Sequence, residues 1–179
     1  MLLIKTNRDT LLKPLQTVTG IVERRQTLPI LSNVLIQQNE EKTSFLTTDL
    51  EIQIKTVTTK DLSSKQNFAL TVSAKKLQDI LRSLSSDAEI TLTQKDDHLQ
   101  VKSGKSAFNL QILPAADFPE VVEESESDAT ITLKQNELKN LLHQVQFAVA
   151  QQDIRYYLNG LLLLTEDKQL ISVGTDGHR

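Results

Sequence analysis

The start of the chain alternates between two hydrophobic periodicities, that of an α-helix and that of a β-strand. Apolar side chains recur at helical spacing between Arg8 and Val22, which predicts a helix with an apolar face of Leu11, Leu12, Leu15, Val18 and Val22. Asn7 stands where it can cap this helix, whereas Pro14 falls inside it and predicts a late start or a kink. Strand-like runs predict strands at Leu2–Thr6, Ile30–Gln38, Thr43–Asp49 and Leu50–Thr59. The predicted order is β-α-β-β-β.

The same order of elements follows a second time. Asn67–Val72 predicts a strand, and Ser73 can cap a helix over Ala74–Leu84 with an apolar stripe of Leu77, Ile80, Leu81 and Leu84. Three alternating runs then predict strands at Ala88–Gln94, His98–Ser103 and Lys105–Leu113. Two tandem β-α-β-β-β units predict one α+β domain over residues 1–119.

An acidic stretch separates this domain from the rest of the chain. Residues 120–128 hold five acidic side chains and no basic one, which is typical of a linker. The formal charge is +2 over residues 1–118 and −5 over residues 119–179. We therefore expect a linker at 120–128 and a second domain from 129 to 179.

The segment after the linker repeats the start of the chain. Sliding the sequence by 127 positions without a gap gives nine identities in 49 positions, and seven of the nine are apolar. The two polar identities pair Thr48 with Thr175 and Asp49 with Asp176. Because the apolar identities fall on predicted strand and helix faces, we interpret the pattern as a duplicated domain.

The second copy lacks part of the first. Its pattern predicts a strand at 130–133, a helix at 134–150 and strands at 158–165 and 169–175. Asp176 and Gly177 then form a strong hairpin signal that no further strand follows. We expect the second domain to be incomplete and the natural chain to continue.

Composition narrows the class of protein. Of the 179 residues 39% are hydrophobic, the formal charge is −3, and cysteine is absent, which excludes disulfides, thiolate zinc sites and cysteine nucleophiles. The N-terminus lacks the basic start and long apolar run of a signal peptide, and the longest aliphatic run, Leu161–Leu164, is too short to cross a bilayer. We expect a soluble cytoplasmic protein without a membrane partner.

Catalytic motifs are missing from the sequence. His98, His143 and His178 have no metal-ligand partner at a recognised spacing, and no P-loop, dinucleotide or serine-hydrolase motif occurs. Asp96 and Asp97 fit a polar hairpin tip better than a metal site. Asp176 with His178 could be half of a catalytic pair, although a turn residue beside a surface histidine is the simpler interpretation. We expect no enzyme, no metal and no cofactor.

Nucleic-acid binding is better supported. Basic side chains lie on the two predicted helices and in the loop after the first, at Arg8, Lys13, Arg24, Arg25, Lys75, Lys76 and Arg82. Segment 151–160 brings together Gln151, Gln152, Arg155, Tyr156 and Tyr157, whose groups suit phosphate and sugar contacts. Solvated helix faces and core tyrosines at a strand start are the alternative, which spacing alone favours. The repeat sets Arg24 and Arg25 on Gln151 and Gln152, so one loop is polar in both copies, and this shifts the balance towards binding.

Five segments resemble the sliding-clamp family, the beta subunits of bacterial DNA polymerase III. They are LLKPLQTVTG (11–20), QTLPILSN (26–33), LPAADFPEV (113–121), QQDIRYYLNG (151–160) and TDGHR (175–179). The resemblance implies a sliding-clamp fold, three similar domains per subunit, and a head-to-tail ring of two subunits around duplex DNA. The sequence then corresponds to the first domain and the opening part of the second. The implied function is a non-catalytic processivity factor that tethers the replicative polymerase and slides without sequence specificity.

The resemblance also implies three sets of site residues. The implied DNA contacts are Arg24, Arg25, Lys75, Gln152, Tyr156 and Tyr157. The implied part of a cleft for linear peptides of polymerases and the clamp loader is Leu158, Thr175, Gly177, His178 and Arg179. The implied first-domain side of the subunit interface is Lys76, Ile80, Leu84, Lys105, Phe108 and Leu110.

Two positions depart from the family pattern. Gln26 replaces a frequent proline, which loosens that loop, and Ala107 stands where a basic interface residue is frequent, so one ion pair is lost. The alternative function, from another class, is a β-rich protein-interaction adaptor that does not encircle DNA.

Overall fold

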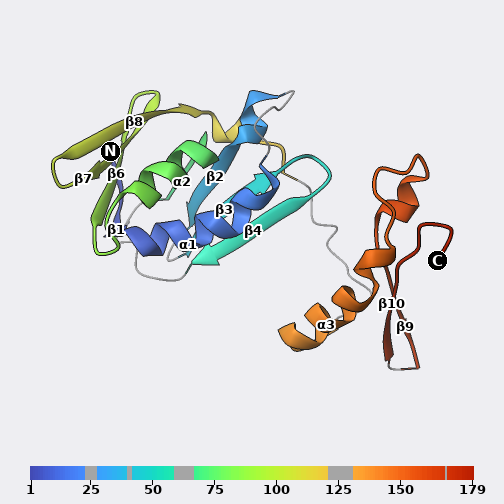
Figure 1. Ribbon diagram of the computed structural model, residues 1–179. Helices are drawn as coiled ribbons and strands as arrows, with labels where there is room; N and C mark the ends of the chain where they lie inside the picture. Colours follow the sequence, from blue (N-terminus) through green and yellow to red (C-terminus); the bar gives the residue numbers. More distant parts are fainter. Residues whose placement is uncertain (23–27, 40–41, 59–66, 121–130, 168) are drawn as a thin grey trace. The chain divides into compact units, whose positions relative to one another are not determined.

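A computed structural model describes residues 1–22, 28–39, 42–58, 67–120, 131–167 and 169–179 (Figure 1). The chain divides into two compact units, Met1–Glu123 and Glu124–Arg179.

The first unit contains two consecutive β-α-β-β-β motifs, as predicted. The first motif consists of β1 (Leu2–Asn7), α1 (Arg8–Val18), β2 (Asn33–Asn39), β3 (Lys42–Thr48) and β4 (Gln53–Thr58). The second consists of β5 (Phe68–Ser73), α2 (Ala74–Ser83), β6 (Glu89–Lys95), β7 (His98–Ser103) and β8 (Ser106–Leu113). This order confirms the α+β prediction for the first domain.

The two motifs exchange their first strands. The sheet order is β1-β6-β7-β8-β5-β2-β3-β4, with β1 antiparallel to β6 and β5 antiparallel to β2. The sheet therefore has two four-stranded halves, β1-β6-β7-β8 and β5-β2-β3-β4. These halves are joined by the pairing of β5 with β8, at Thr71–Leu113 and Val72–Ile112. Strand β8 therefore carries an edge that no described strand pairs with over most of its length.

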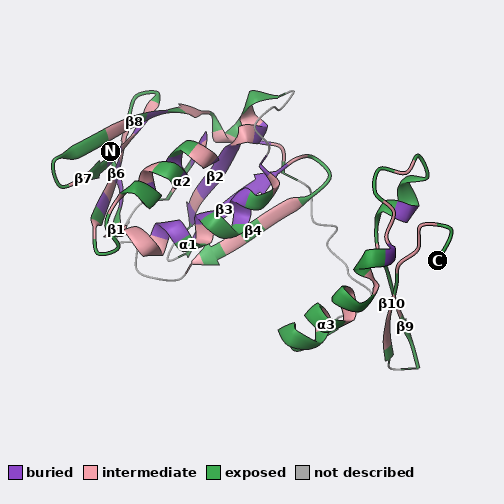
Figure 2. Cartoon of the chain, viewed as in Figure 1, coloured by how far each residue is buried: buried purple, intermediate pink, exposed green. Residues whose placement is uncertain are grey.

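The core lies between the sheet and the two helices, which pack side by side on one face (Figure 1). Leu11, Leu15 and Leu81 are almost completely buried there, and Figure 2 shows buried positions along both helices and on β2 and β3. Gln78 donates a 2.7 Å hydrogen bond to Thr19 Oγ1, which links the end of α1 to α2. Burial of this apolar face is the main source of stability for the unit.

The ends of α1 differ from the prediction. The helix starts at Arg8, so Pro14 does not delay it, and it ends at Val18 rather than Val22 because the chain tightens into a 3-10 turn over Thr19–Ile21. Thr47 Oγ1 donates a 2.5 Å hydrogen bond to the free Val18 carbonyl. Asn7 and Ser73 hold the N-cap positions, but neither side chain makes a capping hydrogen bond.

The second unit is smaller and far less buried (Figure 2). It contains α3 (Gln135–Val145), 3-10 turns at Gln146–Ala148 and Tyr156–Asn159, and the antiparallel hairpin of β9 (Leu162–Glu166) and β10 (Gln169–Val173). The α-helix ends at Val145, five residues before the predicted end at 150, because a tighter 3-10 turn follows it.

Two strand predictions in this unit are wrong. Residues 131–133 form no strand, because no described strand of the unit lies against them, and Thr130 is outside the described residues. The strand predicted from Leu158 begins at Leu162, because Leu158 N–H closes a turn onto the Arg155 carbonyl at 2.9 Å.

Candidate functional site

Residues 151–160, here called the tyrosine loop, are closed by side chains that bind the loop's own backbone. Asn159 accepts from the Asp153 N–H and donates to the Asp153 carbonyl, both at 2.9 Å. The Asp153 carboxylate accepts from the Arg155 N–H at 2.8 Å and from the Arg155 guanidinium at 3.0 and 2.8 Å. Such bidentate, charge-assisted bonds fix the geometry of the loop.

The tyrosine loop presents large side chains to solvent. Tyr156 is 83% exposed and Tyr157 67%, and their rings meet edge to face with centroids 5.9 Å apart. Ile154 is also exposed, while Leu158 turns inward and is buried. The alternative that the tyrosines are core residues is therefore wrong. The sequence alone could not distinguish buried from exposed tyrosines, because it is the 3-10 turn at Tyr156–Asn159 that directs Leu158 inward and leaves the two tyrosines outside.

Residues 175–179 form a tight turn, here called the second Thr-Asp turn. Thr175 Oγ1 accepts from the Gly177 N–H at 3.0 Å and donates to the Arg179 carbonyl at 2.6 Å. Asp176 Oδ1 accepts from the N–H groups of His178 and Arg179 at 2.9 and 3.1 Å. Gly177 has a φ of +87°, which glycine adopts without strain.

The Asp176 carboxylate serves the turn rather than the His178 ring. The hydrogen bond from the His178 N–H is the largest cause that lowers the pKa of Asp176, followed by its bond from Arg179. The ion pair of Asp176 Oδ2 with Arg179 Nε measures 2.9 Å, and the Arg179 guanidinium also lies 5.9 Å over the Phe147 ring. Oδ1 of Asp176 is thus occupied by two main-chain N–H groups and Oδ2 by the Arg179 side chain, and the turn interpretation is confirmed.

Residues 48–52, the first Thr-Asp turn, repeat this geometry in the first unit. Thr48 Oγ1 accepts from the Leu50 N–H at 3.0 Å and donates to the Ile52 carbonyl at 2.9 Å. Asp49 Oδ1 accepts from the N–H groups of Glu51 and Ile52 at 3.0 and 2.7 Å. The hydrogen bonds match those of the second turn one for one, which confirms the 127-residue repeat.

Arg155 reaches from the tyrosine loop to the second Thr-Asp turn. Its Nη2 donates to the Asp176 carbonyl at 3.4 Å, and a Cβ placed on Gly177 would lie 3.1 Å from its Nη1. The side-chain hydrogen bond of Arg155 is the main cause that lowers the pKa of Asp153 to about 2. The sequence placed Arg155 among phosphate-binding groups and assigned Asp153 and Asn159 no role. The D-x-R spacing is the signal that could have revealed the pair.

The predicted interface residues lie on α2 and around β8. Lys76 is exposed, and Ile80, Leu84 and Phe108 are half-buried against the core of the first unit. Leu110 is buried. Lys105 is exposed in the turn before β8. The surface is therefore less apolar than the residue types suggested.

The edge of β8 has the shape of a strand-docking site. Residues Ser106–Gln111 pair with β7 on one side, and only Ile112 and Leu113 pair with β5 on the other. A pocket of about 320 Å³ opens beside this edge and is lined by Lys76, Asn109 and Leu110 among others. Unpaired edge groups of this kind can accept another strand.

The remaining predicted DNA contacts are only partly placed. Lys75 is half-buried near the start of α2, and Gln152 is exposed in the tyrosine loop with a φ of +58°. Arg24 and Arg25, like Gln26, lie outside the described residues. The described structure therefore brings Gln152, Tyr156 and Tyr157 into one loop and leaves Lys75 on the other unit.

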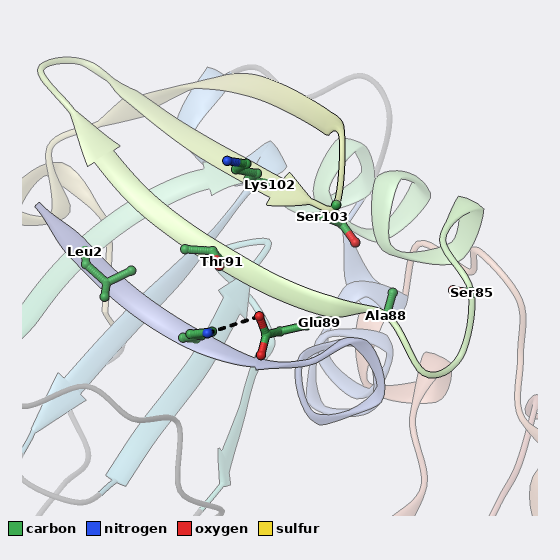
Figure 3. A pocket seen from close by; sticks show the side chains of 9 residues that line it. Leu2, Ser85, Ala88, Glu89, Thr91, Lys102 and Ser103 are labelled. Atoms are coloured by element: carbon green, nitrogen blue, oxygen red, sulfur yellow. Dashed lines mark ion pairs between the residues drawn. The ribbon is translucent and has the colours of Figure 1, made fainter.

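Another pocket of the first unit lies away from the predicted site residues. Figure 3 shows this pocket of about 750 Å³ along β1, β6 and β7, with Leu2, Thr91 and Lys102 among its lining side chains. Lys5 and Glu89 form a 3.1 Å ion pair in it, and no predicted site residue lines it.

Two classes of site are not found in the described part of the chain. No group of three or more His, Cys, Asp and Glu residues there is placed to hold a metal ion. Within the same residues, no helix has the length and apolar character needed to span a membrane.

Comparisons with known proteins agree over both units. Residues 2–122 match the family model of the DNA polymerase III beta subunit, N-terminal domain, and residues 132–179 match its central domain. The beta sliding clamp of Pseudomonas putida is 47% identical over 96% of this chain, and that of Escherichia coli 44% identical over 96%. The chain covers 46% of each of these two relatives, so it spans about half their length.

Solved structures show the same similarity. The DNA polymerase III subunit beta from Pseudomonas aeruginosa matches with a TM-score of 0.92 and 44% identity, over 99% of this chain and 48% of that one. The Caulobacter crescentus pol III beta matches with a TM-score of 0.88 and 37% identity, over 98% of this chain and 48% of that one. The chain belongs to the family of bacterial DNA polymerase III beta subunits, the beta sliding clamps.

Proposed function

We propose that this chain is part of a cytoplasmic processivity factor, a non-catalytic ring that encloses duplex DNA and tethers a replicative polymerase. Family membership supports the class of function, and the exposed, internally locked tyrosine loop is the observation that carries the proposal for this chain. A loop that is held by its own side chains presents the two phenols without losing further conformational entropy on binding.

Gln152, Tyr156 and Tyr157 are the proposed DNA contacts of the second unit, with Lys75, Arg24 and Arg25 contributing from the first. Amide and phenol groups hydrogen-bond to phosphate and sugar, which carry no base sequence. A sliding protein needs such interchangeable contacts, because any strong preference for one sequence would stop it there.

The second Thr-Asp turn, together with Leu158, is the proposed part of a cleft for linear peptides of the polymerase and the clamp loader. The turn consists of Thr175, Asp176, Gly177, His178 and Arg179, and its backbone is ordered by side-chain hydrogen bonds. A preorganised pocket loses little entropy when a peptide side chain enters it.

The β8 edge with α2 is the proposed subunit interface. Lys76, Ile80, Leu84, Lys105, Phe108 and Leu110 lie on or beside these two elements. A strand of a second subunit can pair with Ser106–Gln111, and in a head-to-tail ring the complementary surface belongs to a different part of that subunit.

A chimera tests this proposal. Residues 1–179 replace the matching half of the Pseudomonas putida beta sliding clamp, and the product is assembled on nicked circular DNA. The proposal predicts that the chimera stays on the circle and is released when the DNA is cut, because only a topological link is lost on cutting. Retention that is unchanged by cutting, or no retention when the parent clamp is retained, would favour the adaptor alternative.

A further inference from the structure

One side chain joins the two parts of the second unit that the proposed function assigns to different ligands. The Arg155 guanidinium binds the Asp153 carboxylate inside the tyrosine loop and donates to the Asp176 carbonyl of the second Thr-Asp turn at 3.4 Å. The first segment carries the proposed DNA contacts and the second the proposed peptide contacts. One planar guanidinium, doubly hydrogen-bonded to Asp153 inside the loop, therefore joins the loop to the turn.

The turn has a residue that makes room for this arginine. A Cβ on Gly177 would stand 3.1 Å from Nη1 and 3.3 Å from Nη2 of Arg155, which is closer than ordinary contacts. Any side chain at this position would push the guanidinium away from the Asp176 carbonyl. Glycine thus serves the contact with Arg155 as well as the backbone conformation.

The first copy shows that the turn does not need this arginine in order to fold. The 127-residue repeat sets Leu28 on Arg155 and Leu50 on Gly177. The first Thr-Asp turn nevertheless makes the same set of hydrogen bonds, with Leu50 at a φ of +82°. Arg155 is therefore an addition to a turn that already forms by itself, and its role is to connect that turn to the tyrosine loop.

We propose that Arg155 is a positioning residue that couples DNA contact at Tyr156 and Tyr157 to the peptide-binding turn at Thr175–Arg179. The inference rests on the proposed function and deepens it. DNA that engages the tyrosines shifts the loop, Arg155 transmits the shift to the Asp176 carbonyl, and the amide groups of Gly177, His178 and Arg179 change environment. By reciprocity, a ligand on the turn changes the affinity of the loop for DNA.

The link can be measured without DNA. In the ¹⁵N- and ¹³C-labelled 179-residue chain, the Asp153 carboxyl titrates at a pKa of about 2 when Arg155 holds it. Arg155→Ala returns that pKa towards its ordinary value of 3.8, whereas the control Lys139→Ala, an exposed cation on α3, leaves it low. An unchanged Asp153 titration in Arg155→Ala would overturn the proposal.

The coupling is tested by adding a short mixed-sequence duplex to the same chain and following the backbone amide signals. We expect signals of the tyrosine loop and of residues 177–179 to shift together in the wild type and in Lys139→Ala. In Arg155→Ala the loop signals still shift, while the shifts at 177–179 are largely lost because the connecting group is gone. Arg155→Lys, which keeps the charge but not the fork, resembles Arg155→Ala at 177–179.

Each other outcome has a distinct meaning. If the loop shifts in the wild type while 177–179 do not, or if Arg155→Ala leaves the shifts at 177–179 intact, the coupling is contradicted and the proposed DNA contact stands. If duplex DNA moves neither segment of the wild-type chain, the proposed DNA contact is contradicted and the coupling with it.

Discussion

The two copies within this chain, residues 4–52 and 131–179, share several backbone elements where both are described and differ in the side chains that these elements carry. With the shift of 127, α1 (Arg8–Val18) falls on α3 (Gln135–Val145), and the 3-10 turn Thr19–Ile21 falls on Gln146–Ala148. The 3-10 turn Pro29–Ser32 falls on Tyr156–Asn159 in the same way. The α-helix and the two 3-10 turns therefore begin and end at equivalent positions although only nine of 49 residues are identical, whereas β1 has no counterpart at residues 131–133.

The side chains on this shared backbone are different. Pro29 and Ile30 in the first copy correspond to the exposed Tyr156 and Tyr157, while the inward Leu31 and Leu158 are kept. Buried leucines and the Thr-Asp pair are thus kept in both copies, while the exposed positions between them differ. The duplication therefore separates the residues common to both folds from the exposed residues to which the proposed function assigns DNA contact.

The largest difference between the copies is expected in the core. Leu15 is completely buried in α1, whereas its counterpart Leu142 in α3 is half-buried. Leu15→Ala should lower the free energy of unfolding by about 2–5 kcal/mol, because it leaves a cavity in a closed core. Leu142→Ala should cost about 1 kcal/mol or less, since less apolar area is lost.

Urea denaturation can separate these effects. Circular dichroism reports mainly the first unit, and tyrosine fluorescence reports only the second, because both tyrosines lie at 156 and 157 and the chain has no tryptophan. Equal losses for the two substitutions would contradict the difference in packing.

Exchanging the residue types at the two positive-φ positions, Leu50 and Gly177, should change the stability of the two turns in opposite directions. Leu50→Gly relieves a leucine held at a φ of +82° and should stabilise the first unit by about 1 kcal/mol. Gly177→Leu puts a leucine at a φ of +87° and a Cβ against Arg155, so it should destabilise the second Thr-Asp turn. Thermal unfolding of the first variant and amide exchange of His178 in the second measure the two effects; the same sign for both would break the comparison.

The smallest expected effect is a pH dependence of the second copy. The folded pKa values of Asp153 and Asp176 are lowered, chiefly by hydrogen bonds from Arg155 and from the His178 N–H. Their contribution to stability is therefore fully present above about pH 4 and is lost as the pH falls towards 2, where Asp153 takes up its proton. Tyrosine fluorescence measured at several acidic pH values should report loosening in this range, and Asp153→Asn should remove part of it.

The fold was largely predictable from the sequence, and the site was predictable only in part. Hydrophobic periodicity located both α-helices and the described strands of the first unit, because each buries one regular face. It did not locate the 3-10 turns, and residues 30–32 and 50–52, predicted as strand, form a 3-10 turn and part of the first Thr-Asp turn. It failed at residues 131–133, where a strand depends on a partner and not on its own pattern. The exposure of Tyr156 and the hydrogen bonds made by Arg155 and Asn159 depend on a loop that closes on itself. Such contacts produce no periodic pattern of apolar residues, so the sequence did not predict them.

The central claim is that the tyrosine loop of the second copy contacts the sugar-phosphate backbone of DNA. Fluorescence anisotropy of two unrelated labelled duplexes of equal length measures it directly, with the wild-type chain, Tyr156→Ala/Tyr157→Ala and the matched surface control Lys139→Ala. We predict equal affinity for both duplexes and a loss confined to the double tyrosine variant, because contacts to phosphate and sugar carry no base sequence. Affinity should also decrease with added salt, because the proposed cationic contacts Arg24, Arg25 and Lys75 release counterions from the phosphates. Strong discrimination between the duplexes, or unchanged binding by the double variant, would contradict the account.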